Sequence, residues 1–227
     1  MVPVGVATLV DCNGRSTREI NELIRGAEGS VVVKNPLGRH CLGVAILKPL
    51  QVVFEGPVGW YCATMGDGLE AEIHGNCGWS VGQNLMSGSI VVRGHAGSSS
   101  GATIRGGTIR IEGNSGARTG ISMKGGTLIV GGSVGYMSGF MMQTGTLVVC
   151  GDAADGIGDS MYEGRVFVGG SIASLGSDAV EAEVTDDDLA ELAALGVEPS
   201  QSWTKLVAGR KLWNFSKKEF EVWKAAL

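Results

Sequence analysis

Long apolar runs and an excess of basic charge are both missing from this chain of 227 residues. Its apolar opening, Val4 to Val10, is too short to span a membrane and lacks the charged region and cleavage site of a signal peptide. The chain carries 18 basic and 23 acidic residues, so its net charge of −5 gives no basic surface that predicts nucleic-acid binding. We therefore expect a cytoplasmic protein without a membrane or nucleic-acid partner.

Paired cysteines are missing as well. The thiols stand in no C-x-x-C pair and belong to Cys12, Cys41, Cys62, Cys77 and Cys150. Their spacing predicts neither a disulfide framework nor a zinc or iron–sulfur site, and it fits buried, reduced thiols. His40 and Cys41 are adjacent, but a nucleophilic dyad needs a contact geometry that adjacency does not supply. The sequence also lacks a Walker loop and a dinucleotide-binding fingerprint.

Glycine, in contrast, is abundant and recurs at a fixed interval. The 38 glycines far exceed the usual share of roughly 7%. One series is spaced by 19 residues and consists of Gly56, Gly75, Gly94, Gly113, Gly132, Gly151 and Gly170. Further glycines follow three, seven and thirteen residues later within most of these units. This lattice is typical of a coiled backbone that makes the same tight turns once per revolution.

Each unit also contains a short strand whose apolar residues lie two apart, such as Ile90 and Val92. Residues two apart share one face of a strand, and here that face points inward. A second inward column is formed by Leu85, Ile104, Met123, Met142 and Met161. The position between each apolar pair varies from charged to apolar, which predicts an outer face that is partly wet and partly covered. The pattern predicts an all-β fold, a single-stranded right-handed parallel β-helix of about seven 19-residue coils with short helical caps at both ends.

The segments on either side of the coils do not follow the 19-residue repeat. They can cover the strand edges at the two ends of the rod, which would otherwise favour aggregation. Residues 1–36 are predicted to form an N-terminal cap with one short helix and one strand. The helix would begin at Ser16 or Thr17 and end at Gly26, and the strand would cover Val31 to Val33.

The β-helix itself is predicted over residues 37–175. Residues 176–227 are predicted to form a helical tail that serves as a cap or as a partner-binding arm. Helices are expected from Thr185 to Leu195 and from Ser216 to Ala226, since each opens with a capping sequence.

Two polar columns follow the same period. One is either a ladder that satisfies backbone groups or the lining of a ligand groove, and it consists of Asn76, His95, Asn114, Ser133 and Asp152. The other is either a basic strip for an acidic partner or an ordinary solvated face, and it consists of Arg105, Lys124 and Gln143. The three histidines, His40, His74 and His95, occupy different positions in their units, so they do not predict a metal site.

Catalysis and polymer binding are both poorly supported by the coils. Asp152, Asp155 and Asp159 lie in the turns of the last coil. β-Helix polysaccharide lyases and hydrolases use acids on a face of the β-helix, but the fixed period here leaves no room for the long loops that they carry over a groove. An independent binding module predicts an exposed ladder of one residue type. The outer column is mixed and reads Asn84, Thr103, Ser122, Met141 and Ser160. We therefore assign no catalytic, cofactor-binding or metal-binding residue.

The lattice G-x-x-G-x-x-x-G followed by G-[ST]-[LIV]-x-[VI] is similar to the GXGXG domain. That domain lies at the end of the large chain of glutamate synthases, and it also occurs as a separate subunit of formylmethanofuran dehydrogenases. The residues between the glycines resemble more narrowly the stand-alone β-helix subunit of N-methylglutamate synthases. This resemblance covers about residues 16–215 and is carried by residues 35–40, 56–62, 74–79, 84–88, 120–125, 137–142 and 158–163.

The resemblance implies a non-catalytic scaffold subunit of an enzyme that joins methylamine to glutamate and releases ammonia. One partner would resemble a class II glutamine amidotransferase, and another the glutamate synthase barrel that holds FMN and an iron–sulfur cluster. This chain would hold neither cofactor, and it has Val2 after Met1 where such an amidotransferase exposes an N-terminal cysteine. Alternatives are the same role in another glutamate synthase or in a formylmethanofuran dehydrogenase-like complex, and an independent binding module.

Overall fold

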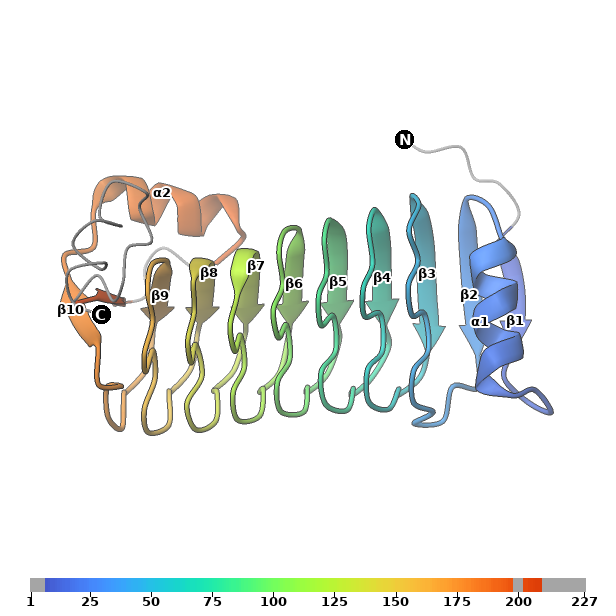
Figure 1. The fold of residues 1–227 in the computed structure, drawn as a ribbon, viewed down its shortest axis with the longest axis horizontal. Helices are drawn as coiled ribbons and strands as arrows, with labels where there is room; N and C mark the ends of the chain where they lie inside the picture. The colour runs from blue at the N-terminus through green and yellow to red at the C-terminus, as the bar shows by residue number, and fades with distance from the viewer. Residues whose placement is uncertain (1–6, 198–201, 210–227) are drawn as a thin grey trace, which may run out of the picture.

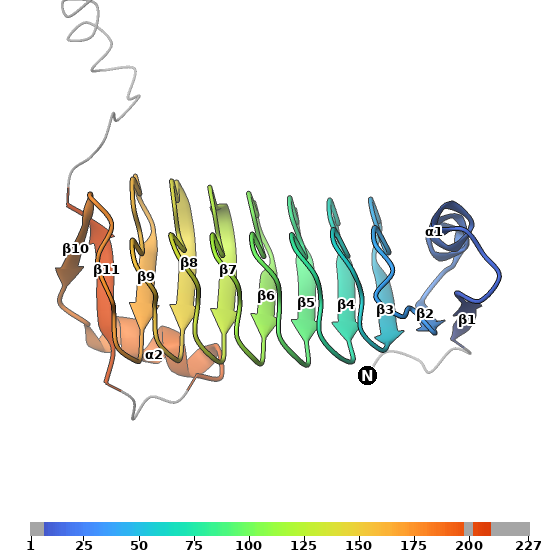
Figure 2. The same cartoon turned by 90° about the horizontal axis from the view of Figure 1, so that it is seen from below.

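The computed structural model describes residues 7–197 and 202–209, which form an elongated solenoid of stacked coils (Figures 1 and 2). The strands along the rod are β1 (Thr8–Asp11), β2 (Ser30–Lys34), β3 (Leu50–Glu55), β4 (Leu69–Ile73), β5 (Gly88–Val92), β6 (Thr108–Ile111), β7 (Lys124–Val130), β8 (Thr144–Val149) and β9 (Arg165–Val168). Each strand pairs in parallel with the next, so they make one continuous sheet in chain order. The predicted parallel β-helix is confirmed.

The number of turns is about eight, not seven, because β2 also belongs to the stack. Val31 on β2 pairs with Val52, 21 residues later, whereas Val52 pairs with Ala71 at the regular interval of 19. The longer connection takes β2 out of the sequence period, so the predicted strand was placed in the cap and not in the coils.

The core runs along the axis of the rod as stacked columns of apolar side chains. Ile90 and Val92 on β5 are fully buried, and so are Ile109 and Ile111 on β6. The second predicted column, Leu85, Ile104, Met123, Met142 and Met161, is also fully buried. Each such side chain contributes roughly 1.5–3 kcal/mol through burial. Because the columns are continuous, every coil buries its apolar face only against its neighbours.

One corner of each coil is a turn with three residues of positive φ, spaced two apart. In the coil after β3 these are Tyr61, Ala63 and Met65, with φ values of 59°, 54° and 56°. Their N–H groups bond to neighbouring coils, and that of Tyr61, for example, donates to the Trp79 carbonyl at 2.8 Å. In the coils that follow, the middle position is a lattice glycine such as Gly82, for which φ is +65°. This explains one of the glycine columns, since glycine adopts this conformation without strain.

The N-terminal end is covered by α1 (Thr17–Gly26), which lies where the sequence predicted a helix. Ser16 is its N-cap, and Ser16 and Glu19 form a reciprocal capping box. Ile20 and Ile24 face inward and are fully buried. The helix therefore closes the core at the first coils (Figure 1).

The C-terminal end contains a helix and two strands. Helix α2 (Asp186–Ala194) begins at the Thr185 cap, as predicted. Strands β10 (Ala179–Ala182) and β11 (Thr204–Ala208) pair antiparallel, and β11 also pairs antiparallel with β9. Only helices were predicted here from the sequence, so strands β10 and β11 are a difference from the prediction. The helix predicted from Ser216 to Ala226 lies outside the described residues.

Helix α2 lies across the outer face of the sheet near β7 to β9 (Figures 1 and 2). Leu192 packs there in a second apolar cluster with Ile129, Val148 and Phe167, which stand between the inward pairs of their strands. On β3 and β5 the corresponding Val53 and Val91 are only half-buried. The outer face is thus partly covered and partly wet, as predicted, and the cover lies over β7 to β9. Among the residues that the structure describes, no helix is long and apolar enough to cross a membrane.

Candidate functional site

The predicted polar column forms a ladder of hydrogen bonds between coils. The Asn76 Oδ1 accepts from the N–H of His95 at 2.8 Å, and the His95 Nδ1 accepts from the N–H of Asn114 at 2.9 Å. Asn114, Ser133 and Asp152 continue the series, each accepting from the N–H 19 residues later at 2.8–3.0 Å. The interpretation of this column as a ladder that satisfies backbone groups is confirmed.

The three acids of the last regular coil bond to serines of the segment that follows. Asp152 accepts from Ser171, Asp155 accepts from the Ser174 hydroxyl, and Asp159 accepts from Ser177. The Ser171 N–H holds the pKa of Asp152 below its usual value, and the Ser177 N–H does the same for Asp159. These carboxylates therefore bind residues 171–177 to the coil that precedes them.

Three of the five cysteines are buried as predicted, namely Cys12, Cys62 and Cys77. Burial raises the pKa of each thiol, and it raises that of Cys77 to about 12, so these side chains stay protonated at neutral pH. The expectation of burial is wrong for Cys41, which is exposed, and Cys150 is half-buried. Cys41 lies at a left-handed turn position, with φ of 55°.

The adjacent His40 and Cys41 do not act together. The His40 Nδ1 accepts a hydrogen bond from the N–H of Trp60 at 2.9 Å, and its ring stacks on the Trp60 indole. Over residues 7–197 and 202–209, no group of three or more His, Cys, Asp or Glu side chains is arranged to hold a metal ion. In the second polar column, Arg105 and Gln143 are exposed and Lys124 is half-buried.

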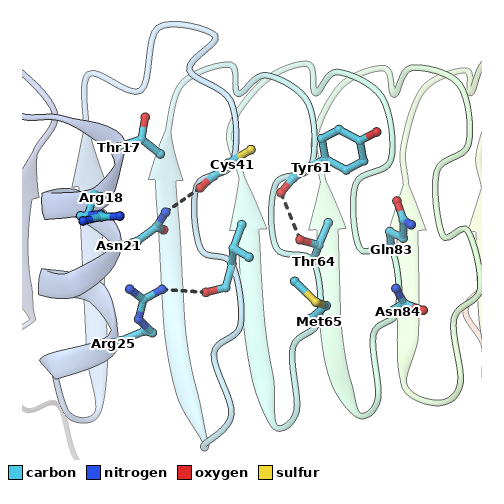
Figure 3. Close-up of a pocket in the computed structure, with 11 residues that line it drawn as sticks. Thr17, Arg18, Asn21, Arg25, Cys41, Tyr61, Thr64, Met65, Gln83 and Asn84 are labelled. Atoms are coloured by element: carbon cyan, nitrogen blue, oxygen red, sulfur yellow. Dashed lines mark hydrogen bonds between the residues drawn. The ribbon is translucent and has the colours of Figure 1, made fainter.

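A groove separates α1 from the turn corner of the first coils (Figure 3). Its volume is about 480 Å³, which falls within the usual range of ligand sites. We call it the α1 groove. It is lined by Thr17, Arg18, Asn21, Arg25, Cys41, Val44, Tyr61, Thr64, Met65, Gln83 and Asn84.

The helical wall of the α1 groove is fastened to the coils by Asn21 and Arg25. The Asn21 Nδ2 donates to the Cys41 carbonyl at 2.6 Å, and its Oδ1 accepts from the N–H of Gly43 at 2.8 Å. Arg25 donates through Nη1 to the Val44 carbonyl at 3.2 Å. These contacts hold the helix at a fixed distance from the turns, so the groove is a preformed feature of the fold.

The charge of the α1 groove is opposite to that of the chain as a whole. Its lining includes the guanidinium groups of Arg18 and Arg25 and no carboxylate, whereas the chain has a net charge of −5. The other polar groups are amides, hydroxyls and the exposed Cys41 thiol. This set can bind an anionic group through guanidinium donors and orient it through neutral hydrogen bonds.

Three stacked rings lie next to this groove in the chain, and we call them the aromatic ladder. His40 stacks on Trp60 with ring centroids 4.6 Å apart, and Trp60 stacks on Trp79 at 5.4 Å. Trp60 and Trp79 are 45% and 56% exposed, which is unusual for tryptophan. His40 and Trp60 directly precede the groove residues Cys41 and Tyr61.

Neither the groove nor the aromatic ladder was predicted from the sequence. The spacing of Trp60 and Trp79 by one period was the available signal for the ladder. The groove depends on where α1 packs, which no repeat pattern encodes.

The chain is similar to Protein GlxC of Rhizobium meliloti (strain 1021). The two are 43% identical over 76 residues, and the match covers 33% of this chain and 33% of that relative. The similarity thus spans about a third of the relative's length. No family model matches the chain.

Two kinds of side chain can be distinguished among those described above. Those of the polar ladder and the terminal acids hold one coil to the next. The second kind is exposed at the N-terminal end of the rod and includes Arg18 and Tyr61 of the α1 groove with Trp60 and Trp79 of the aromatic ladder. The second kind is therefore available for a binding partner.

Proposed function

We propose that this chain is a non-catalytic scaffold subunit of a glutamate synthase-like multisubunit enzyme, and specifically of an N-methylglutamate synthase. That enzyme would join methylamine to L-glutamate, giving N-methyl-L-glutamate and ammonia. The flavin and the iron–sulfur cluster would belong to a barrel subunit, and the amidotransferase-like activity to a further subunit. The complex would work in the cytoplasm.

The observation that supports this proposal most strongly is the continuous bonding of each coil to the next, combined with the exposed aromatic side chains at one end of the rod. One sheet of parallel strands runs through every coil, and a polar ladder locks the turns beside it. A body of this kind can hold two catalytic subunits in fixed register, which is the geometric requirement for passing a reactive amine between them.

The choice of enzyme rests on the resemblance of the glycine lattice and its intervening residues to the GXGXG domain. Protein GlxC is 43% identical to this chain over 76 residues, and this similarity does not specify a substrate. Another glutamate synthase or a formylmethanofuran dehydrogenase-like complex remains the alternative assembly for the same scaffold role.

The test is a native purification of this chain from its source cell, with absorption spectra and mass spectrometry of the proteins that accompany it. We expect an amidotransferase-like subunit, a barrel subunit and flavin absorption, and turnover of methylamine with glutamate. A colourless homo-oligomer without partners would contradict the scaffold role. Turnover with ammonia but not methylamine would keep the scaffold role and reject the assigned substrate.

A further inference from the structure

We propose that the α1 groove and the aromatic ladder together form the surface on which this chain receives an acidic segment of a catalytic partner subunit. This inference rests on the proposed scaffold function and adds to it the face that meets the partner. The occupant is a polypeptide segment that places carboxylates against Arg18 and Arg25 and apolar side chains against the tryptophans.

The first argument is the composition of the surface. Protein–protein binding energy is concentrated in tryptophan, tyrosine and arginine side chains near the centre of an interface. Tyr61, which is 45% exposed, lines the groove with Arg18 and Arg25, and the exposed Trp60 and Trp79 belong to the same coils as the groove residues Tyr61 and Gln83. The position of Trp60 and Trp79 in the next two coils holds Ser98 and Ala117. The tryptophans are therefore confined to the coils next to the groove and are no requirement of the repeat.

The second argument is the preorganisation of the rings. The stacking of His40, Trp60 and Trp79 fixes the planes of the indoles before any partner binds. The His40 ring is itself held by the bond from the Trp60 N–H to its Nδ1. Rigid aromatic side chains lose little conformational entropy on binding, so their burial contributes more to affinity than that of flexible side chains.

The third argument is charge. The α1 groove has two arginines and no acid in its lining, within a chain whose net charge is −5. Arg18 and Arg25 are exposed on α1, so an acidic segment would find there two positive charges with no carboxylate between them in the lining of the groove. Complementary charge of this kind steers association and selects against wrong partners.

The fourth argument is the shape of the floor of the α1 groove, the side opposite the helix. This floor is formed by three neighbouring coils, at residues 41–44, 61–65 and 83–84. With coils about 4.8 Å apart the floor is on the order of 10 Å long, which accommodates about three residues of an extended chain. Backbone N–H groups of the floor, such as those of Tyr61 and Met65, already bond to the next coil. Recognition must therefore come from side chains, and the polar ones that line the groove include Arg18, Gln83 and Asn84.

The experiment compares variants in the complex purified from cells that carry the whole set of subunits. Trp60→Ala with Trp79→Ala removes the ladder, and Arg18→Glu reverses the charge without removing a hydrogen bond among the described residues. Tyr136→Ala is the matched control for the ladder, because Tyr136 occupies the same coil position and is 53% exposed. Arg118→Glu is the control for charge, since Arg118 is exposed on a coil outside the surface. Thermal unfolding of each isolated variant checks that the rod is intact.

We expect the double tryptophan variant and Arg18→Glu to bind the partner about thirtyfold more weakly or worse, and both controls to bind as the wild type does. Binding of the wild-type chain should also weaken as salt is raised, and that of Arg18→Glu should depend less on salt. Retention of partners by both surface variants overturns the inference while leaving the scaffold function standing. A wild-type chain that brings no catalytic subunit rejects the scaffold function itself. If the wild-type chain is a homodimer and the double tryptophan variant is a monomer, the surface binds a second copy of this chain. That outcome also overturns the inference.

Discussion

At the scale of single residues, the glycine lattice serves two distinct physical needs. Gly82 supplies a left-handed turn, with φ of +65°. Gly97 has no such conformation, but a Cβ there would lie 2.5 Å from the Trp79 Cδ1 and 2.8 Å from the carbonyl carbon of Gly78. The period in the sequence therefore records both backbone conformation and the close approach of one coil to the next.

Gly97→Ala is expected to destabilise the protein by about 1–3 kcal/mol, because the added methyl group overlaps the backbone of the preceding coil. Chemical denaturation followed by circular dichroism measures this loss. Gly26→Ala is the control, since its Cβ would meet no heavy atom within 4 Å. There we expect no loss, or a gain of about 0.5 kcal/mol from reduced freedom of the unfolded chain. Equal losses in the two variants would contradict the close-approach explanation.

At the scale of elements, α2 is fastened to the sheet through Asp188. Its Oδ2 accepts from the Thr185 N–H at 2.9 Å and from the Lys205 Nζ at 2.6 Å. The Asp188 and Lys205 side chains are only 4% and 14% exposed. Arg165 binds Glu191 on the same helix through two bonds of 2.8 Å. One carboxylate thus joins the start of the helix to β11.

The pKa of Asp188 makes this junction sensitive to acid. Burial alone would raise the pKa, but the bonds from Lys205 and Thr185 outweigh it and lower the value from 3.8 to about 2. Because the folded pKa is the lower one, the carboxylate stabilises the fold above about pH 4 and loses this contribution as the pH falls towards 2. The contribution amounts to about 2 kcal/mol.

Asp188→Asn is expected to lower the free energy of unfolding at pH 7 by about 2 kcal/mol or more, because it leaves the Lys205 ammonium without its counter-charge. The variant should also lose the acid-dependent part of stability between pH 4 and pH 2. Urea titrations at several pH values measure both effects. Asp187→Asn, one residue away and exposed, should match the wild type. If the free energy of unfolding of Asp188→Asn depended on pH as steeply as that of the wild type, other carboxylates would govern the acid response.

The elements that the sequence predicted are those with local or periodic signals. Helix α1 begins at a Ser16–Glu19 capping box, and α2 at a Thr185–Asp188 one, so both starts were readable. Strands β10 and β11 were not predicted. They have four and five residues, and Ala179 pairs with Ala208 far along the chain. Pairing of that kind depends on tertiary context and leaves no period.

The candidate surface was predicted less well than the fold for a similar reason. Left-handed turn positions such as Tyr61 and Met65 hold ordinary residues, so nothing in their identity marks the corner that they form. The groove exists because Asn21 and Arg25 fasten α1 to that corner across about 20 residues of chain. Exposure of Trp60 and Trp79 likewise follows from the coil geometry, whereas tryptophan in a sequence usually indicates burial.

At the scale of the whole molecule, a solenoid must protect the two ends of its sheet. At one end α1 and β1 lie beyond β2, and at the other β11 covers β9. Leu206 on β11 is fully buried in the main core and lies opposite Val166. Strand β11 therefore both completes the core and occupies the hydrogen-bonding edge of the last regular coil.

Leu206→Asp is expected to release β11, because a carboxylate cannot be buried there without a partner. The edge of β9 would then be free to pair with another chain, so we expect concentration-dependent self-association that light scattering and size-exclusion chromatography can follow. Val180→Asp on β10 is the control, because Val180 is 42% exposed on the outermost strand and its replacement leaves β11 in place. If Leu206→Asp stays monomeric while losing stability, the strand serves the core alone and the edge is protected by another part of the chain. If it associates while the central coils keep their amide protection, each coil depends only on its neighbours, as the one-dimensional architecture requires.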